Sequence, residues 1–312
     1  MGIGGRSVNP VWARKPLPRA ASSPPRAKLP NHQPHDKNRR MQEKERGGKG
    51  HGTKRWMRRP PGFGPGQRPG GPRRERRTGN HTLLYGWQPV RAALENPARN
   101  IRRLLATENG AHRLQEAGLT TRFSPEIVRP AIIDQLLPPD AVHQGLYAEA
   151  DPLPAPDLEE IEPGLVLILD QITDPHNFGA IVRSAAAFDA KAIVTTARHS
   201  PEATGVLAKS ASGGLEHVPL VLVQNLARAM AALKDRGFQL VGLAEEADSD
   251  LADVVMHSPI ALVIGAEGKG MRQLTRDTCD VLARLDMPGT IKSLNVSNAT
   301  ALALFVASRA IR

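Results

Sequence analysis

The chain contains a single cysteine, Cys279, among its 312 residues. One cysteine excludes a disulfide within the chain and a cysteine-rich metal site, and it fits a reducing compartment. We interpret Cys279 as a small buried residue, with a nucleophile as the alternative. The sequence also has no run of 18 apolar residues, so we expect no membrane-spanning helix.

Acidic residues are scarce in the first quarter of the chain. Residues 1–79 hold 21 lysines and arginines against 4 acidic residues, whereas the rest of the chain holds 21 against 27. The segment is rich in proline and glycine and has no apolar periodicity, so we expect residues 1–80 to form a disordered basic arm. Its arginine clusters, with Trp56 and Phe63 nearby, favour contact with RNA. A solubilising tail is one alternative; an organelle import signal is another, which the many prolines argue against.

The segment that follows alternates short strands and helices. Strands are expected at 83–85, 101–107 and 145–149, and helices at 88–94, 111–117 and 125–137. The pattern predicts a small α/β domain over residues 81–150. It holds no carboxylate pair or metal-ligand spacing, so binding is a better interpretation than catalysis, and His143 and Gln144 are interpreted as surface polar groups. Three alternating prolines then mark a linker, placed at 151–163.

Residues 164–312 follow a different pattern. Apolar strands are expected at 165–169, 191–196, 218–223, 239–244, 260–265 and 281–286, and helices lie between most of them, with the last at 296–310. This alternation predicts a mostly parallel sheet with helices on both faces. Ligands of such sheets bind beyond the carboxyl ends of the strands, and three polar clusters fall at those ends.

The first polar cluster is residues 174–183. Asn177 can cap the following helix, Gly179 lets another backbone come close, and Arg183 lies about one and a half turns further along the helix. For Arg183, a surface ion pair with a carboxylate is the alternative. His176 is interpreted as a loop residue, because no second histidine lies near it in sequence to share a metal.

The second cluster, residues 265–271, is a glycine-rich turn directly after a strand. Its spacing fits neither the Walker phosphate loop nor the dinucleotide fingerprint. Glu267 either supports this loop or contacts a ligand. The third cluster, residues 287–299, begins with a Pro-Gly break and places short polar side chains before the last helix. A helix cap and a ligand site both remain open for it.

The three clusters together resemble the three motifs of the SpoU family of S-adenosylmethionine-dependent RNA ribose 2′-O-methyltransferases. The matching patterns are Asn177-x-Gly179-x-x-x-Arg183, then Gly265-x-Glu267-Gly268-x-Gly270, and last Met287-Pro288-Gly289 followed by Ser293-Leu294-Asn295-Val296-Ser297. Residues 85–90 and 143–145 resemble the RNA-binding domain of the branch that methylates a guanosine in large-subunit ribosomal RNA.

This resemblance implies a fold and partners. Residues 164–312 would form a parallel-sheet α/β domain tied in a trefoil knot, and residues 81–150 an L30e/L7Ae-like RNA-binding domain. The enzyme would be a cytoplasmic bacterial homodimer with its active site at the subunit interface. It would use S-adenosylmethionine (AdoMet), act on 23S ribosomal RNA or precursor ribosomal particles, and need neither metal nor membrane. A mitochondrial location is the minor alternative.

The resemblance also assigns roles to residues. Catalytic roles fall to Arg183, Asn177, Glu267, Ser293 and Asn295, and cofactor contacts to Gly265, Leu285, Met287 and Leu294. The family mechanism makes Arg183 the general base. Because arginine stays protonated in proteins, we prefer a role in which Arg183 binds the target phosphate and stabilises the forming 2′-alkoxide. For Ser293 and Asn295, hydrogen bonds that lock the knot are the alternative.

Three competing functions remain to be weighed. Transfer RNA is an alternative substrate, although the extra domain at 81–150 favours ribosomal RNA within the family. A non-catalytic RNA-binding or ribosome-assembly protein would keep the basic arm and the small domain without using the cofactor. A nucleotide hydrolase is disfavoured by the missing Walker spacing.

Overall fold

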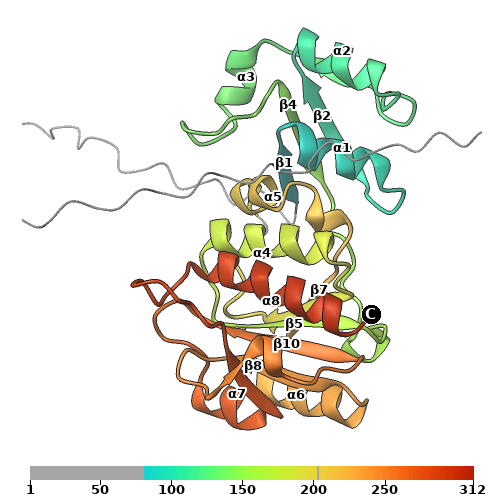
Figure 1. Ribbon diagram of the computed structural model, residues 1–312. Coiled ribbons are helices and arrows are strands. Elements are labelled where there is room, and N and C mark those ends of the chain that lie inside the picture. The colour runs from blue at the N-terminus through green and yellow to red at the C-terminus, as the bar shows by residue number, and fades with distance from the viewer. Residues whose placement is uncertain (1–80, 202–203) are drawn as a thin grey trace, which may run out of the picture. The chain divides into compact units, whose positions relative to one another are not determined.

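The computed structural model describes residues 81–201 and 204–312, which form a four-stranded and a seven-stranded sheet (Figure 1). The basic arm expected at residues 1–80 lies outside the described residues. Among the helices of the described part, none is long and apolar enough to cross a membrane.

The smaller sheet has the strand order β1-β4-β2-β3. Strand β4 runs antiparallel to both of its neighbours, and β3 pairs parallel with β2 at the edge. The apolar face of α1, with Val90, Ala93 and Leu94, packs on this sheet. The elements are β1 (Thr82–Tyr85), α1 (Trp87–Glu95), β2 (Ile101–Ala106), α2 (Glu108–Glu116), β3 (Glu126–Ile127), α3 (Pro130–Asp134) and β4 (Leu146–Ala150).

The single helix expected at 125–137 is wrong. Residues 126 and 127 form the edge strand β3, and only Pro130–Asp134 is helical. Proline disfavours the helical conformation of the residue before it, and Arg129 accordingly has an extended backbone with Pro130 as the first helical residue. The proline therefore starts a short helix here instead of lying within a longer one.

Gln144 is exposed, as expected of a surface polar group, whereas His143 is half-buried, and both side chains make hydrogen bonds. The Gln144 side-chain oxygen accepts hydrogen bonds from the Trp87 backbone N–H at 2.9 Å and from Lys209 Nζ at 3.1 Å. His143 Nδ1 accepts from the Gly145 N–H at 3.0 Å, and its Nε2 lies 3.1 Å from Asp134 Oδ1. Both side chains therefore hold the turn before β4 in place.

The larger sheet has the order β7-β6-β5-β10-β8-β11-β9, and every neighbouring pair is parallel. The predicted parallel α/β architecture is thus confirmed. Its strands are β5 (Leu165–Asp170), β6 (Ala192–Thr196), β7 (Leu220–Val223), β8 (Gln239–Leu243), β9 (Ser249–Asp250), β10 (Ile260–Gly265) and β11 (Val281–Arg284). Its helices are α4 (Pro175–Ala187), α5 (Gly205–Ala211), α6 (Leu226–Asp235), α7 (Gln273–Thr278) and α8 (Val296–Ala310).

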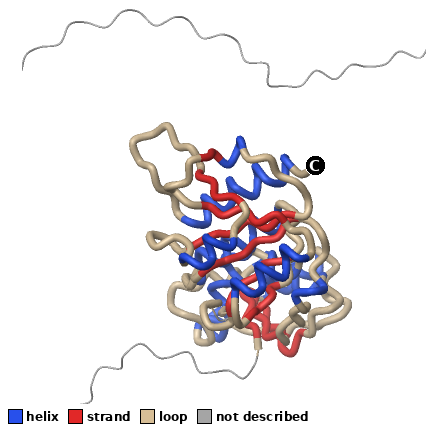
Figure 2. The backbone as a smooth tube through the Cα atoms, turned by 90° about the horizontal axis from the view of Figure 1, so that it is seen from below, coloured by secondary structure: helices blue, strands red, loops and turns tan. Residues whose placement is uncertain are grey.

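Two apolar cores cover the two faces of this sheet. Successive side chains of a strand point to opposite faces, so Leu165, Leu167 and Leu169 of β5 enter one core while Val166 and Ile168 enter the other. Helices α4 and α8 pack side by side on the first face, and α6 lies on the second (Figure 1). Figure 2 shows the strands flanked by helices on either side. This burial on both faces explains the continuous apolar runs in the sequence.

The segment before β7 contains a helix that sequence analysis did not identify. Helix α5 packs on α4, and a short 3-10 helix, η2 (Gly214–Glu216), follows it. Close packing of α5 on α4 requires a glycine, because a Cβ on Gly179 would lie 2.6 Å from the Leu207 carbonyl oxygen. Gly179 therefore permits the close backbone approach that its position suggested.

Cys279 follows α7 and is half-buried, less than the burial that we expected. Its Sγ donates to the Thr275 carbonyl at 3.3 Å, and burial raises the pKa of the thiol to about 12. Because the thiolate is the reactive form, we predict that iodoacetamide at pH 8 modifies Cys279 at least about tenfold more slowly in the native protein than in urea. Mass spectrometry of timed samples measures this, and equally rapid labelling in both conditions would contradict the shielding of the thiol.

Candidate functional site

A cavity of about 810 Å³ opens at the carboxyl edge of the larger sheet. It lies beyond the ends of β8, β10 and β11 and beside the start of α8. This is where ligands bind in parallel sheets. Its lining consists of residues 243–246, 264–271, 283–287 and 292–294, with Arg276, Val296 and Ala299.

The glycine-rich turn forms one wall of this cavity. Ala266 and Gly270 exchange backbone hydrogen bonds of 3.1 and 2.8 Å, which closes a tight loop after β10. A Cβ on Gly265 would lie 2.1 Å from the Gly270 carbonyl carbon, so only glycine fits at this position. Gly268 and Gly270 have φ values of 74° and 63°, a conformation that glycine adopts without strain. These glycines therefore allow the chain to form a tight turn whose backbone faces the cavity.

A buried carboxylate fixes the far end of this turn. Asp170, the last residue of β5, is 1 % exposed and pairs in register with Gly265. Its side chain accepts from the Arg272 backbone N–H at 3.0 Å and from Arg272 Nε at 2.8 Å. Sequence analysis did not identify Asp170 or Arg272 as site residues. The available signal was an acidic residue closing an otherwise apolar strand, because a buried charge needs a partner.

The chain segment 244–248 forms a second wall. It joins β8 to β9, and these strands flank β11 on its two sides, so the segment crosses the carboxyl end of β11. The Arg284 guanidinium donates to the carbonyl oxygens of Ala247, at 2.8 Å, and of Asp248. The Asp286 N–H donates to Asp250 Oδ2 at 2.9 Å. These bonds hold segment 244–248 against the end of β11 and the residues that follow it.

The start of α8 forms a third wall, and its asparagine is a helix cap. Asn295 Oδ1 accepts from the Ser297 N–H at 3.0 Å, and its Nδ2 donates to Asn177 Oδ1 at 2.9 Å. The first turns of α4 and α8 are thereby joined through two side chains that are 118 positions apart. Ser293 lines the cavity, and its side chain makes no hydrogen bond to another described residue.

The cavity brings together most, but not all, of the residues expected at the site. Those that line it are Gly265, Glu267, Leu285, Met287, Ser293 and Leu294. Asn177 and Asn295 are bonded to each other beside it, and neither lines it. Arg183 lies elsewhere and lines a second cavity, so one chain does not bring its guanidinium to the first. Within the described residues, no cluster of three or more His, Cys, Asp or Glu side chains is arranged to hold a metal.

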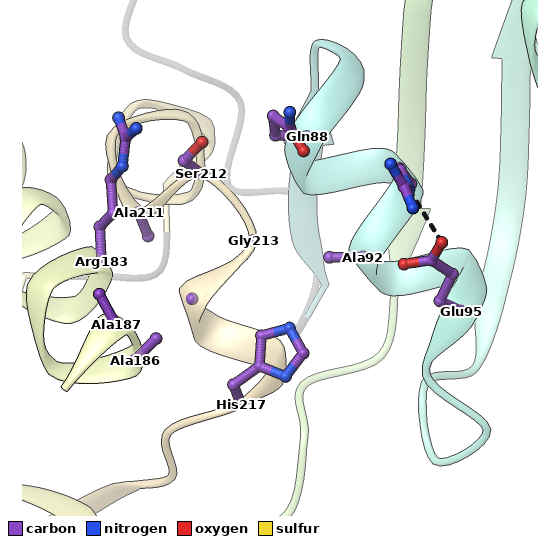
Figure 3. A pocket seen from close by; sticks show the side chains of 12 residues that line it. Gln88, Ala92, Glu95, Arg183, Ala186, Ala187, Ala211, Ser212, Gly213 and His217 are labelled. Atoms are coloured by element: carbon purple, nitrogen blue, oxygen red, sulfur yellow. Dashed lines mark hydrogen bonds and ion pairs between the residues drawn. The ribbon is translucent and has the colours of Figure 1, made fainter. Parts of the chain in front are cut away.

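The second cavity has a volume of about 320 Å³ and lies between α1, the end of α4, and residues 211–217 (Figure 3). Arg183 extends from α4 toward Ser212 in this view. The guanidinium is exposed and forms no ion pair or hydrogen bond with any described residue. The surface ion pair that we considered for Arg183 is therefore not formed in the described part of the chain, and its charge is left free for a ligand.

Comparison with known proteins gives the chain a family. The sequence model of the SpoU rRNA Methylase family matches residues 164–305, and that for RNA 2′-O ribose methyltransferase substrate binding matches residues 83–156. The 23S rRNA (guanosine-2′-O-)-methyltransferase RlmB of Ralstonia nicotianae is 40% identical over 236 residues, which cover 73% of this chain and 95% of that protein. The protein of the same name from Photobacterium profundum is 39% identical, with coverage of 74% and 98%.

Solved structures show the same fold. The SpoU methyltransferase AviRb from Streptomyces viridochromogenes, in complex with the cofactor AdoMet, superimposes with a TM-score of 0.64 at 28% sequence identity. The match covers 76% of this chain and 93% of that one. Sequence, domain matches and fold therefore agree, and the chain belongs to the SpoU rRNA methylase family.

Proposed function

We propose that this protein transfers a methyl group from AdoMet to the ribose 2′-hydroxyl of a guanosine in 23S ribosomal RNA. The observation that carries the proposal is the cavity at the carboxyl edge of the sheet, where the glycine-rich turn, the end of β11 and the start of α8 meet. The relatives named for this reaction align over almost their whole length. The match over residues 83–156 supports an RNA-binding role for the smaller domain.

The cavity fits AdoMet in size and in chemistry. Its volume of about 810 Å³ lies within the range of roughly 300–1,000 Å³ typical of cofactor pockets. Its lining combines apolar side chains with the backbone of two glycine-containing loops. We assign adenine contact to backbone groups near Gly265, Leu285 and Met287, with Leu294 packing against the ring. Leu294 is 38% exposed, so an apolar ligand surface would cover it.

AdoMet supplies an activated methyl group, so the protein's own tasks are alignment and the handling of one proton. Glu267 and Ser293 line the cavity, and their side chains bond to no other residue of the described ranges. Both are proposed to orient the substrates. Asn177 and Asn295 hold the two helix starts together. Arg183 is proposed to bind the target phosphate and to stabilise the 2′-alkoxide as it forms, because a guanidinium remains charged and donates in a fork.

Arg183 and the cofactor cavity are proposed to meet across two copies of the chain. In one chain they lie apart. Helix α8 exposes Leu302 and Phe305, which are 48% and 47% accessible, and the loop before it exposes Ile291 at 77%. Exposed apolar side chains in this number indicate a contact surface. A homodimer that buries this surface would cover α8 next to the cavity and bring the partner's Arg183 toward it.

The finer features of the fold are part of the same proposal. Because segment 244–248 crosses the end of β11, we propose that the chain passes through this loop and forms a trefoil knot. Residues 81–150 are proposed to be an L30e-like RNA-binding domain, 151–163 a linker and 164–312 the methyltransferase domain. A cytoplasmic location is proposed from the substrate, since ribosomal RNA is found there in bacteria.

One incubation tests the reaction. The full chain is mixed with AdoMet carrying a labelled methyl group and with unmodified 23S ribosomal RNA or transfer RNA, and the products are hydrolysed in alkali. A 2′-O-methyl group blocks cleavage at its own nucleotide, so the label is expected in an alkali-resistant dinucleotide from 23S RNA that begins with guanosine. If only transfer RNA becomes labelled, transfer RNA replaces 23S ribosomal RNA as the proposed substrate. If calorimetry detects no AdoMet binding, the methyltransferase proposal is wrong and a non-catalytic RNA-binding protein is the remaining interpretation.

Removing residues 1–79 is predicted to weaken RNA binding and to reduce its salt dependence. The segment carries 21 lysines and arginines, and the slope of log K against log salt falls by about 0.7–0.9 for every phosphate that the protein no longer neutralises. Fluorescence anisotropy with one RNA at several salt concentrations measures both quantities. An unchanged slope would show that the arm does not contact phosphates.

A further inference from the structure

Helix α1 of the RNA-binding domain is fixed to the methyltransferase domain at its N-terminal end. Gln144 receives hydrogen bonds from both the Trp87 N–H and Lys209 of α5, at 2.9 and 3.1 Å. The glycine before α1 lets this contact form, because a Cβ on Gly86 would lie 2.3 Å from Lys209 Nζ. Lys209 also lies over the Tyr85 ring at 5.9 Å, and burial lowers the pKa of its ammonium group.

A second contact fixes the C-terminal end of the same helix. Glu216 of η2 accepts from Asn96 Nδ2 at 2.8 Å and from Arg99 Nη2 at 2.6 Å and Nε at 3.0 Å. The Arg99 and Glu216 side chains are 3% and 1% exposed, so this ion pair is shielded from water and salt. Arg99 also donates to the Asp151 carbonyl at 2.6 Å. The two contacts hold α1 at a set distance from the methyltransferase domain.

The smaller cavity lies along α1, which contributes Gln88, Ala92 and Glu95 to its lining (Figure 3). Gly213 allows residues 211–217 to approach α1 closely, because a Cβ at this position would lie 2.8 Å from the Ala92 Cβ. The volume of about 320 Å³ is at the lower end of the range found for ligand sites. A preformed space of this size suits one small unit of a larger ligand.

The polar groups that line this cavity favour an anion with oxygen acceptors. Gln88, Arg183 and His217 line it, and none of their side chains bonds to another described residue. Glu95 contributes the one carboxylate of the lining, and Arg91 neutralises it through an ion pair at 2.8 Å. The guanidinium of Arg183 is therefore a charge that no carboxylate of the lining compensates, and Gln88 and His217 add two further hydrogen-bonding groups.

We propose that this cavity binds one nucleotide of the substrate RNA next to the methylated one, with Gln88 and His217 donating to its phosphate. The inference rests on the proposed function and adds a subsite to it. A phosphodiester supplies the negative charge and the acceptor oxygens that the lining lacks. The RNA is then held by the same chain whose Arg183 acts on the target ribose. Glu216 and Gln144 act as positioning residues, because they hold α1 and hence Gln88 in place.

The test uses the full chain and a fragment of unmodified 23S RNA that the enzyme methylates. The double variant Gln88→Ala/His217→Ala removes both proposed phosphate donors. The matched control is Gln224→Ala/His257→Ala, because those side chains are exposed and line neither cavity. RNA fragments in which one phosphate at a time is an uncharged methylphosphonate locate the contact. The measurements are kcat, KM for RNA, and the RNA dissociation constant by anisotropy.

The cavity variant is expected to raise KM and the dissociation constant for RNA about tenfold, as the removal of two hydrogen bonds would, with kcat within about twofold. One methylphosphonate position should weaken binding to the unsubstituted protein and to the control more than binding to the cavity variant, which keeps Arg183. Unchanged RNA affinity in the cavity variant, or equal sensitivity of all proteins to every methylphosphonate, overturns the subsite. Absence of methyl transfer by the unsubstituted protein defeats the proposed function instead, and the anisotropy data still decide the subsite.

Discussion

Replacing Arg183 with alanine is expected to lower kcat for methyl transfer about 100- to 1,000-fold, the usual cost of removing one group that stabilises charge in a transition state. The side chain is exposed and makes no bond to other described residues, so its removal should not change folding. AdoMet binding by the isolated protein should also persist, because Arg183 does not line the cavity that we propose for the cofactor in its own chain. Single-turnover rates and calorimetry measure the two properties.

Arg183→Lys tests which property of arginine matters. Lysine keeps the positive charge but lacks the planar fork that contacts two oxygens at once. We expect this variant to remain at least about tenfold slower than the unsubstituted protein. Near-normal turnover by the lysine variant would show that charge alone suffices and would contradict the role of the fork.

Replacing Glu216 with alanine is expected to lower the free energy of unfolding by about 3–5 kcal/mol, because breaking a buried ion pair leaves the other charge without its partner. Arg99 is 3% exposed and would lose three hydrogen bonds to that carboxylate. Urea denaturation measures the change. Trp87 fluorescence is a suitable probe, since this residue starts the helix that the pair anchors.

The same helix offers a matched control for Glu216. The Arg91–Glu95 pair has a similar bond length of 2.8 Å, but both side chains are 47% exposed. Exposed pairs contribute little, so Glu95→Ala should change stability by less than about 1 kcal/mol. Equal costs for the two substitutions would mean that burial does not strengthen the Arg99–Glu216 contact. The Glu216 variant should also raise KM for RNA, because α1 would lose one of its two anchors.

The architecture was predictable where local pattern determines structure. Buried strands such as β5 and β10 are uninterrupted apolar runs, and the strand–helix alternation led to the parallel sheet. The last helix was expected at 296–310, and it has those bounds. Gly265 could be placed at a tight turn because only glycine tolerates such close backbone contact. In these cases the determining interactions lie within a few residues of each other in the sequence.

The contacts that join distant segments were not predictable in the same way. The Arg99–Glu216 pair spans 117 positions and the Asp170–Arg272 pair spans 102. No local spacing encodes such a pairing, which depends on where the strands and helices finally lie. Lys209 of α5 was missed for the same reason, since its partner Gln144 is in the other domain. The separation of Arg183 from the cofactor cavity is likewise a property of the assembled fold.

In the proposed active site, one copy of the chain holds the cofactor while the other supplies Arg183. Mixing two inactive variants tests this arrangement most directly. One is Arg183→Ala, and the other is Ser293→Trp, whose added ring fills the cavity without removing a hydrogen bond. Gel filtration first confirms that both variants are dimers. After random exchange of subunits, half of the dimers contain one chain of each kind, and each of these has one complete site, so about one quarter of the normal activity should return. A mixture that stays inactive while heterodimers form would show that Arg183 does not act across the interface.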